Sequence, residues 1–183
     1  LTDARDMAVP FFGPLPLPGS ESSAFLTRWE VVALGAVKGG VMGTAYPRSG
    51  RGYAWRNAPR KACPGCDALS MPTLLEAPRQ GIYLMRSVVT ARKAMAVRVA
   101  VGSDSPFRMW LNGRDLCHSR TATNPVIPDL YGVKARLRRG LNEVMAAFDG
   151  RNGMGWGITV RFQPVPPARQ LPPDALVIPP RRR

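Results

Sequence analysis

Residues 95–113 read MAVRVAVGSDSPFRMWLNG, and this stretch contains the patterns that decide the fold. Every second residue of 95–101 is apolar, which is the alternation of a half-buried β-strand. Residues 102–106, GSDSP, predict a turn, and FRMWL at 107–111 predicts the next strand. The Asn112-Gly113 pair that follows is the strongest short-range signal for a β-hairpin.

Similar patterns continue on both sides of this stretch. FLTRWEVVALGAV at 25–37 predicts a first strand, and IYLMRSVVTA at 82–91 predicts another. After the hairpin, alternation recurs in 133–138 and 156–162, while LNEVMAAFD at 141–149 is apolar enough to have both faces covered. Short strands separated by turn signals predict an all-β domain, an antiparallel sandwich or barrel.

The placement of proline divides the chain into a domain and two arms. Residues 1–23 contain closely spaced prolines among apolar residues, which predicts an extended arm, and they lack the basic start of a signal peptide. Residues 24–162 form the predicted β-sandwich domain, with 38–81 as a long loop region that includes a short strand near Tyr53. Residues 163–183 predict a second extended, proline-rich tail with a basic tip.

The charge balance points to an anionic partner. The 183-residue chain has 26 Lys and Arg against 12 Asp and Glu, a formal net charge of +14. Such a chain attracts acidic protein surfaces, anionic lipid or nucleic acid. Solvated charge is the ordinary and preferred interpretation of a basic sheet face. Against it, few acidic residues are present to balance these groups and like charges opposite one another destabilise a sheet, so an unpaired basic face suggests an anionic partner. Strand alternation predicts such a face from these residues: Arg98, Arg108, Lys134, Arg136, Arg138 and Arg161.

The sequence offers little of what catalysis needs. Its one histidine, His118, has no evident set of catalytic partner residues in the sequence, so we interpret it as a surface residue of a strand. The motifs of serine hydrolases, zinc proteases, P-loop NTPases and dinucleotide-binding folds are missing from the sequence. Asp104 is a single carboxylate where calcium usually takes several, which favours a turn-capping role. We therefore expect a protein that is not an enzyme and has no cofactor or metal site.

The three cysteines leave several interpretations open. Cys63 and Cys66 form a C-x-x-C around Pro-Gly, and Cys117 stands apart beside His118. A structural zinc needs four ligands, and adjacent residues of a strand point to opposite faces, so Cys117 and His118 do not easily reach one metal. A redox pair needs a βαβ context that the surrounding sequence lacks. A tight turn with free or locally bridged thiols is preferred, with a metal site or a redox pair as alternatives.

Four short motifs, in this order, resemble those of galactose-binding-domain-like jelly rolls. They are Gly102-Ser103-Asp104, Trp110-Leu111-Asn112-Gly113, Arg139-Gly140-Leu141-Asn142 and Trp156-Gly157. The similarity covers about residues 25–162 and is densest from 82 onward. The resemblance implies a two-sheet antiparallel jelly-roll sandwich, a module that is common beside bacterial glycoside hydrolases and in large envelope proteins. It implies no particular ligand, because these motifs are mainly turns and core.

Two functions from different classes fit these features. In the first, which we prefer with the second as the alternative, the chain is a non-catalytic accessory or scaffolding subunit that docks on a larger assembly, with an acidic protein or anionic membrane surface as partner. It would dock through the basic face and through these arm residues: Phe11, Phe12, Leu15, Leu171, Ile178, Arg181, Arg182 and Arg183. In the second, which the resemblance favours, the chain is a carbohydrate-binding module whose glycan would stack on Tyr53, Trp55 or Tyr131.

Nucleic-acid binding is a third hypothesis. The net charge permits it, but the sequence lacks helix-turn-helix, zinc-finger and RNP-type motifs. For location, a periplasmic, cell-envelope or membrane-peripheral setting is favoured, and a cytoplasmic one stays open.

Overall fold

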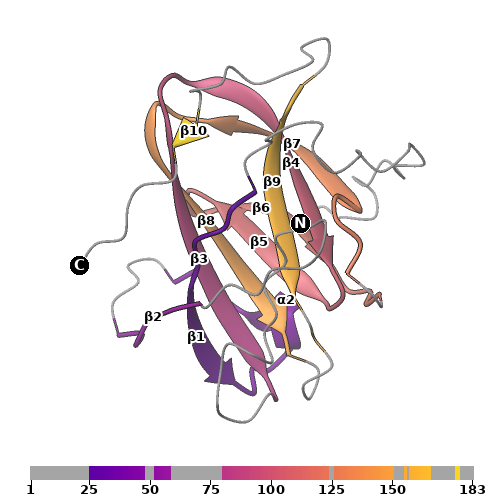
Figure 1. Ribbon diagram of the computed structural model, residues 1–183. Helices are drawn as coiled ribbons and strands as arrows, with labels where there is room; N and C mark the ends of the chain where they lie inside the picture. The colour runs from indigo at the N-terminus through magenta and orange to yellow at the C-terminus, as the bar shows by residue number, and fades with distance from the viewer. Residues whose placement is uncertain are drawn as a thin grey trace.

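The chain folds into two antiparallel β-sheets that pack against each other (Figure 1). The computed structural model describes residues 25–47, 52–58, 80–123, 126–150, 155, 157–165 and 176–177. Within these residues every strand pairs antiparallel with its neighbours. The predicted all-β, two-sheet antiparallel sandwich is confirmed.

The larger sheet contains most of the strands. They are β1 (Glu30–Gly35), β2 (Arg56–Asn57), β3 (Ile82–Ala91), β5 (Phe107–Leu111), β6 (Arg114–Ser119), β8 (Gly140–Asp149) and β10 (Leu176–Val177). Their order is β2-β1-β3-β8-β5-β6, and β10 also pairs with β3.

The smaller sheet has three strands among the described residues, in the order β7-β4-β9. They are β4 (Met95–Ser103), β7 (Tyr131–Leu137) and β9 (Ile158–Pro164). The one helix in the part of the chain that the structure describes, α2 (Gly40–Gly43), is a single turn. No described helix is long and apolar enough to cross a membrane.

Most strand positions agree with the sequence pattern. β3 spans the predicted residues 82–91 and β5 the predicted residues 107–111. The first predicted strand, 25–37, is shorter in the structure, because β1 begins at Glu30 and residues before it contact the other sheet. Phe25 forms an isolated bridge with Arg161 of β9.

Three segments contain structure that the sequence did not indicate. α2 lies within the predicted loop region 38–81, where only a short strand was expected. β9 runs to Pro164, past the expected domain boundary at 162. Leu176 and Val177 form β10 at the edge of β3, and Leu176 packs against the main core. This part of the predicted C-terminal tail is joined to the domain, contrary to the expectation of an arm that adds little to it.

The Asn112-Gly113 turn joins β5 to β6, as the sequence predicted. The two residues have positive φ values of 53° and 80°, which this turn requires and which asparagine and glycine accept at low cost. The turn is also tied to β8. The Asn112 N–H donates to the Glu143 carbonyl at 2.8 Å, and the Glu143 N–H donates to Asn112 Oδ1 at 3.0 Å.

Asn142 of β8 satisfies the backbone where the chain crosses from β7 to β8. Its side chain is buried, and its Oδ1 accepts hydrogen bonds from the Arg138 N–H and from Asn112 Nδ2, both at 2.9 Å. Its Nδ2 donates to the carbonyls of Arg138 and Gly140, both at 2.9 Å. One amide group therefore holds the β7–β8 connection and the β5–β6 turn together.

Apolar side chains pack on both faces of the larger sheet. The main core lies between the two sheets and includes Val99, Met109 and Phe148. A second cluster, around Leu84 and Trp110, lies on the outer face and is covered by these side chains: Val37, Val41, Met42, Tyr46, Tyr53 and Trp55. This second layer explains why β8 is apolar on both faces.

Removing the Asn142 amide is expected to destabilise the fold strongly. Asn142→Ala should lower the free energy of unfolding by about 3 kcal/mol, because several backbone groups lose their partners inside the protein. Asn142→Asp keeps the shape but loses both Nδ2 donations, and it should destabilise as well. Denaturant unfolding measures both effects, with the exposed Arg136→Gln as a control expected within about 0.5 kcal/mol of the wild type. Wild-type stability of Asn142→Ala would contradict this role.

Candidate functional site

The predicted basic face is divided between the two sheets, since Arg108 lies on β5 of the larger one. Its Nε and Nη2 donate to the two oxygens of Asp115 at 2.9 and 3.0 Å. Its Nη1 donates to the carbonyls of Met42 and Thr44 at 2.9 and 3.1 Å. The guanidinium also lies 5.1 Å from the centroid of the Trp110 ring. Arg108 therefore fastens the segment around α2 to the sheet.

Arg161 is buried and has Asp129 as its counter-ion. Its Nε donates to Asp129 Oδ1 at 2.9 Å, and its Nη2 donates to Oδ2. The guanidinium lies 5.0 Å from the Phe25 ring centroid. The expectation of an exposed Arg161 is wrong, because the chain around Asp129 folds back over the outer face of the smaller sheet. A Cβ at Gly102 of that face would lie 2.3 Å from the Ile127 carbonyl oxygen.

The other predicted basic residues lie on or beside the outer face of the smaller sheet. Arg98 of β4 is in register with Lys134 of β7, and its Nη1 donates to Gln163 Oε1 at 2.8 Å. Lys134, Arg136 and Arg138 are exposed. No ion pair of these three is found in the described part of the chain. A role of this group in binding a partner stays a prediction.

The predicted arm contacts lie outside the described residues. They are Phe11, Phe12, Leu15, Leu171, Ile178, Arg181, Arg182 and Arg183, and the same holds for Cys63 and Cys66.

The three aromatic residues expected to stack on a glycan are not equivalent. Tyr131 is buried, its hydroxyl is bonded to the Ser119 hydroxyl at 3.1 Å, and its ring meets Phe107 edge to face at 5.4 Å. It belongs to the core and offers no open ring. Tyr53 and Trp55 are half-buried neighbours, with ring centroids 5.9 Å apart and planes at 64°. They meet edge to face and do not form one flat platform.

Tyr53 and Trp55 belong to a larger surface at the edge of the larger sheet. We call it the outer-edge patch, and it consists of Glu30, Tyr53, Trp55, Asn57 and Arg86. Glu30 of β1 lies in register with Asn57 of β2 and with Arg86 of β3, so the three side chains share one face of the sheet. The Arg86 guanidinium lies 4.7 Å from the Trp55 ring centroid, which brings the aromatic and charged groups together.

Glu30 and Arg86 are paired in a way that leaves hydrogen-bonding capacity. Arg86 Nε and Nη2 both donate to the same oxygen, Glu30 Oε2, at 2.8 and 2.5 Å. Glu30 Oε1 and Arg86 Nη1 form no hydrogen bond with any described residue. The side chains are 41% and 25% exposed, so solvent reaches the pair. An acceptor and a donor held side by side beside an aromatic ring can bind two neighbouring hydroxyl groups.

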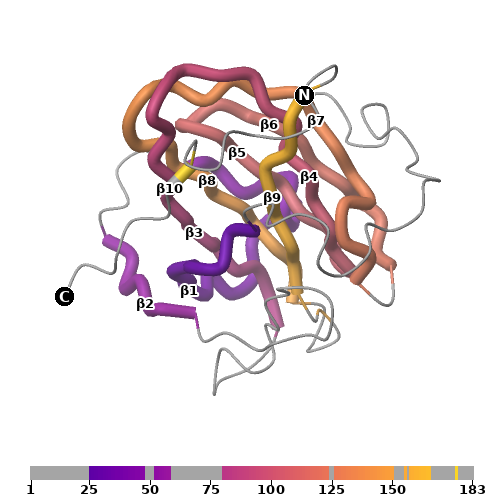
Figure 2. The backbone as a smooth tube through the Cα atoms, turned by 45° about the horizontal axis from the view of Figure 1, so that its top comes forward, coloured from indigo at the N-terminus to yellow at the C-terminus, as the bar shows by residue number. Residues whose placement is uncertain are grey.

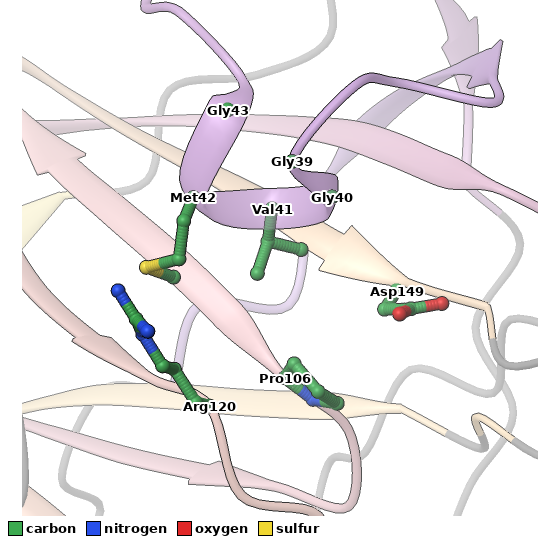
Figure 3. Close-up of a pocket in the computed structure, with 8 residues that line it drawn as sticks. All are labelled: Gly39, Gly40, Val41, Met42, Gly43, Pro106, Arg120 and Asp149. Carbon is green, nitrogen blue, oxygen red and sulfur yellow. The ribbon is translucent and has the colours of Figure 1, made fainter.

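An open pocket of about 540 Å³ lies beside α2 (Figure 3). It is lined by Gly39, Gly40, Val41, Met42, Gly43, Pro106, Arg120 and Asp149. Figure 3 shows Val41 and Met42 pointing from the helix turn towards Pro106 and Arg120, with Asp149 on the far side of the pocket from Arg120. This lining has one cation, one carboxylate and no aromatic ring, so it is less suited to a sugar than the outer-edge patch.

Asp104 is buried in the turn between β4 and β5, and it binds two segments outside that turn. Its Oδ1 accepts a hydrogen bond from the Gly157 N–H at 3.3 Å, and its carbonyl accepts one from the Thr123 N–H at 3.1 Å. No group of three or more His, Cys, Asp or Glu side chains that could hold a metal ion occurs among the described residues.

Cys117 and His118 of β6 are both buried. Burial raises the pKa of the Cys117 thiol to about 12, so the thiol is neutral at physiological pH. The expectation that His118 lies at the surface is wrong. His118 is in register with Arg108, on the outer sheet face that the segment around α2 covers.

Comparisons with known proteins bear on the fold. No family model matches the chain, and no curated protein matches it. A family 35 carbohydrate-binding module from an environmental isolate aligns with a TM-score of 0.40 and 10% identity, over 57% of this chain and 76% of that one. An anti-sigma factor domain-containing protein from Clostridium clariflavum aligns with a TM-score of 0.47 and 8% identity, over 85% of this chain and 48% of that one. A GH2 beta-galacturonidase from Eisenbergiella tayi aligns with a TM-score of 0.46 and 15% identity, over 78% of this chain and 24% of that one.

The two-sheet antiparallel sandwich that the resemblance implied is what the structure itself shows. The neighbours include a carbohydrate-binding module and a GH2 enzyme. The chain covers about half of the anti-sigma factor protein and about a quarter of the galacturonidase. With TM-scores below 0.5, these similarities support no statement about a ligand, and the function is argued from the residues of this chain.

Removing the carboxylate of Asp129 should destabilise the domain. Asp129→Asn keeps a residue that accepts the positive φ of 60° but removes the negative charge that binds the buried Arg161, and breaking a buried ion pair costs about 3–5 kcal/mol. Denaturant unfolding measures the loss. The double variant Asp129→Asn/Arg161→Met removes both charges and should recover a large part of it. A single variant as stable as the wild type would contradict a structural ion pair.

The Cys117 thiol should be inert in the folded protein. In a Cys63→Ser/Cys66→Ser variant, its reaction with a disulfide reagent near neutral pH should proceed only as fast as the protein opens, because a buried neutral thiol is a poor nucleophile. The raised pKa also sets a pH dependence. The stability from the buried neutral thiol is complete below about pH 9, the ordinary thiol pKa, and is lost as the pH rises towards 12. Fast labelling of the native variant would show that Cys117 is accessible.

Proposed function

We propose that this chain is a non-catalytic carbohydrate-binding module that contacts its glycan at the outer-edge patch. The observation that carries the proposal is the Glu30–Arg86 pair beside the half-buried ring of Trp55. One oxygen of Glu30 and one nitrogen of Arg86 have no hydrogen-bond partner among the described residues, and both side chains are partly exposed to solvent.

Sugars present two chemical faces, and the patch has a counterpart for each. The C–H groups of a pyranose ring pack on an aromatic ring, which Trp55 and Tyr53 supply. Neighbouring hydroxyl groups bind an acceptor and a donor held at fixed separation, and the Arg86–Glu30 ion pair fixes that separation before any ligand arrives. Asn57, exposed and in register with Glu30, adds an amide that both donates and accepts.

The composition of the patch supports binding without hydrolysis. Glycosidases ordinarily use two carboxyl groups about 5–9.5 Å apart, one of which acts as a general acid. The outer-edge patch has one carboxylate, Glu30, and this carboxylate accepts two hydrogen bonds from Arg86. We therefore propose that the module holds a glycan for a neighbouring activity and performs no reaction itself.

The proposal is tested by screening neutral and uronate-containing oligosaccharides and then measuring the affinity of the best ligand by calorimetry. Trp55→Ala and Glu30→Gln should each weaken binding about tenfold or more, since each removes a group that contacts the sugar. Asp115→Asn is the matched control. Asp115 is also bound by an arginine on the outer face of the larger sheet, with 43% of its side chain exposed against 41% for Glu30.

The control variant should keep its affinity within about twofold, as expected for a surface change remote from the ligand. If no oligosaccharide binds, or if Asp115→Asn weakens binding as much as Glu30→Gln, the outer-edge patch is not a glycan site. The accessory-subunit hypothesis, which depends on the arms, would then be the next to test.

A further inference from the structure

Two of the connections that cross between the sheets lie side by side at one end of the sandwich. One joins β3 to β4 and the other joins β7 to β8. Ala91 at the end of β3 pairs with Gly140, and Met95 at the start of β4 pairs with Leu137, so the connections begin and end next to each other. Figure 2 shows both passing over the same end of the molecule, at the top of the view.

These connections concentrate positive charge, and the nearest carboxylate in the sequence, Glu143, is bound by the Tyr46 hydroxyl. We call this surface the basic end, and it consists of Lys93, Arg136, Arg138, Arg139 and Leu141. The basic side chains are all exposed, and no ion pair of theirs is found in the described part of the chain. Residues 91–95, ARKAM, and 136–142, RLRRGLN, contain neither Asp nor Glu. Four cations close together, with a net charge of +14 behind them, create a strongly attractive potential for an anion.

An exposed apolar side chain lies among these cations. Leu141 is 54% exposed, more than Ile127 at 41%, the other large exposed hydrophobic residue among those described. Arg138 Nε donates to the Leu141 carbonyl at 2.9 Å, which fixes a guanidinium beside the leucine. A single exposed leucine needs no explanation by itself. Here it is flanked by arginines at the end of a rigid sandwich, where the Asn142 amide holds the connection in place.

We propose that the basic end docks the module on an anionic lipid bilayer, with Leu141 entering the headgroup region and the surrounding cations contacting acidic headgroups. A membrane fits this surface because the cations surround a protruding apolar group at one end of the domain. Burying such a group lowers the free energy of binding only if the partner has an apolar interior that takes it out of water. Arginine binds phosphate and carboxylate in bidentate fashion, which suits acidic lipid headgroups.

This inference goes beyond the proposed function and uses none of the outer-edge patch residues. Glycan binding and bilayer docking would involve separate surfaces, so either proposal can fail while the other holds.

The test measures the binding of the full chain to vesicles of phosphatidylcholine with and without phosphatidylserine, by co-sedimentation at low salt and at about 0.5 M salt. The wild type should bind only the vesicles with phosphatidylserine, and salt should weaken binding. Lys93→Gln/Arg138→Gln/Arg139→Gln should lower the partition coefficient about a hundredfold, since each basic residue near an anionic bilayer contributes roughly fivefold. Leu141→Ser alone should lower it about fivefold at unchanged charge.

A charge-matched control distinguishes the effect of the basic end on vesicle binding from the effect of net charge. Lys38→Gln/Arg56→Gln/Arg120→Gln removes one lysine and two arginines that are exposed elsewhere, and it should bind within about threefold of the wild type. The proposal would be overturned if both triple variants lost vesicle binding equally. It would also be overturned if Leu141→Ser bound vesicles as well as the wild type, or if the wild type did not bind anionic vesicles. Binding to an anionic polysaccharide such as heparin but not to vesicles would overturn it too and would assign the basic end to a polyanion. Thermal melts of each variant exclude unfolding as the cause.

Discussion

The buried amide of Asn142 is the constraint on which the rest of the sandwich depends. β8 is a central strand of the larger sheet, paired with β3 on one side and with β5 on the other. Its start is where the chain arrives from the smaller sheet, so backbone groups there have no regular ladder to join. The amide supplies those groups with partners and also binds Asn112 at the tip of the β5–β6 hairpin. The register of β8 is thereby fixed, and the registers of its two neighbours follow from it.

A second constraint is the shortage of carboxylates. With 12 acidic residues against 26 basic ones, most cations have no ion-pair partner available. Arg86, Arg108 and Arg161 each have one, and each pair joins segments on the outer face of a sheet. These three carboxylates thus neutralise cations that the fold itself partly or fully buries. The exposed cations that remain, at the basic end above all, determine which partners the surface attracts.

Much of the fold was predictable from the sequence, because strand alternation and turn residues are local signals. The stretches around β3, β4, β5 and β8 and the Asn112-Gly113 turn were all expected. Alternation also assigned side chains to inner and outer faces. It could not tell that an outer face would be covered again, as it is over His118 and Arg161, because the covering segments come from distant parts of the chain.

The candidate site was less predictable, for a similar reason. Tyr53 and Trp55 were recognised by residue type, but Glu30 and Arg86 are 56 residues apart and only sheet pairing brings them together. Tyr131 was a misassignment that the sequence itself could have prevented. It is in phase with Val133 and Leu137 on β7, and that spacing places its ring in the core. Pairing between distant strands leaves no such local trace.

The location of β2 has a consequence for how this module can diversify. Tyr53, Trp55 and Asn57 are contributed by the connection between β1 and β3, whereas the register of β3 is set independently along its whole length by β8. Mutations in this connection can therefore alter the shape and chemistry of the outer-edge patch while the central strands keep their alignment. Glu30 and Arg86 would stay as a fixed element to which different aromatic or polar neighbours are added. One sandwich can in this way give rise to a lineage of modules that differ in specificity and share the same folding core.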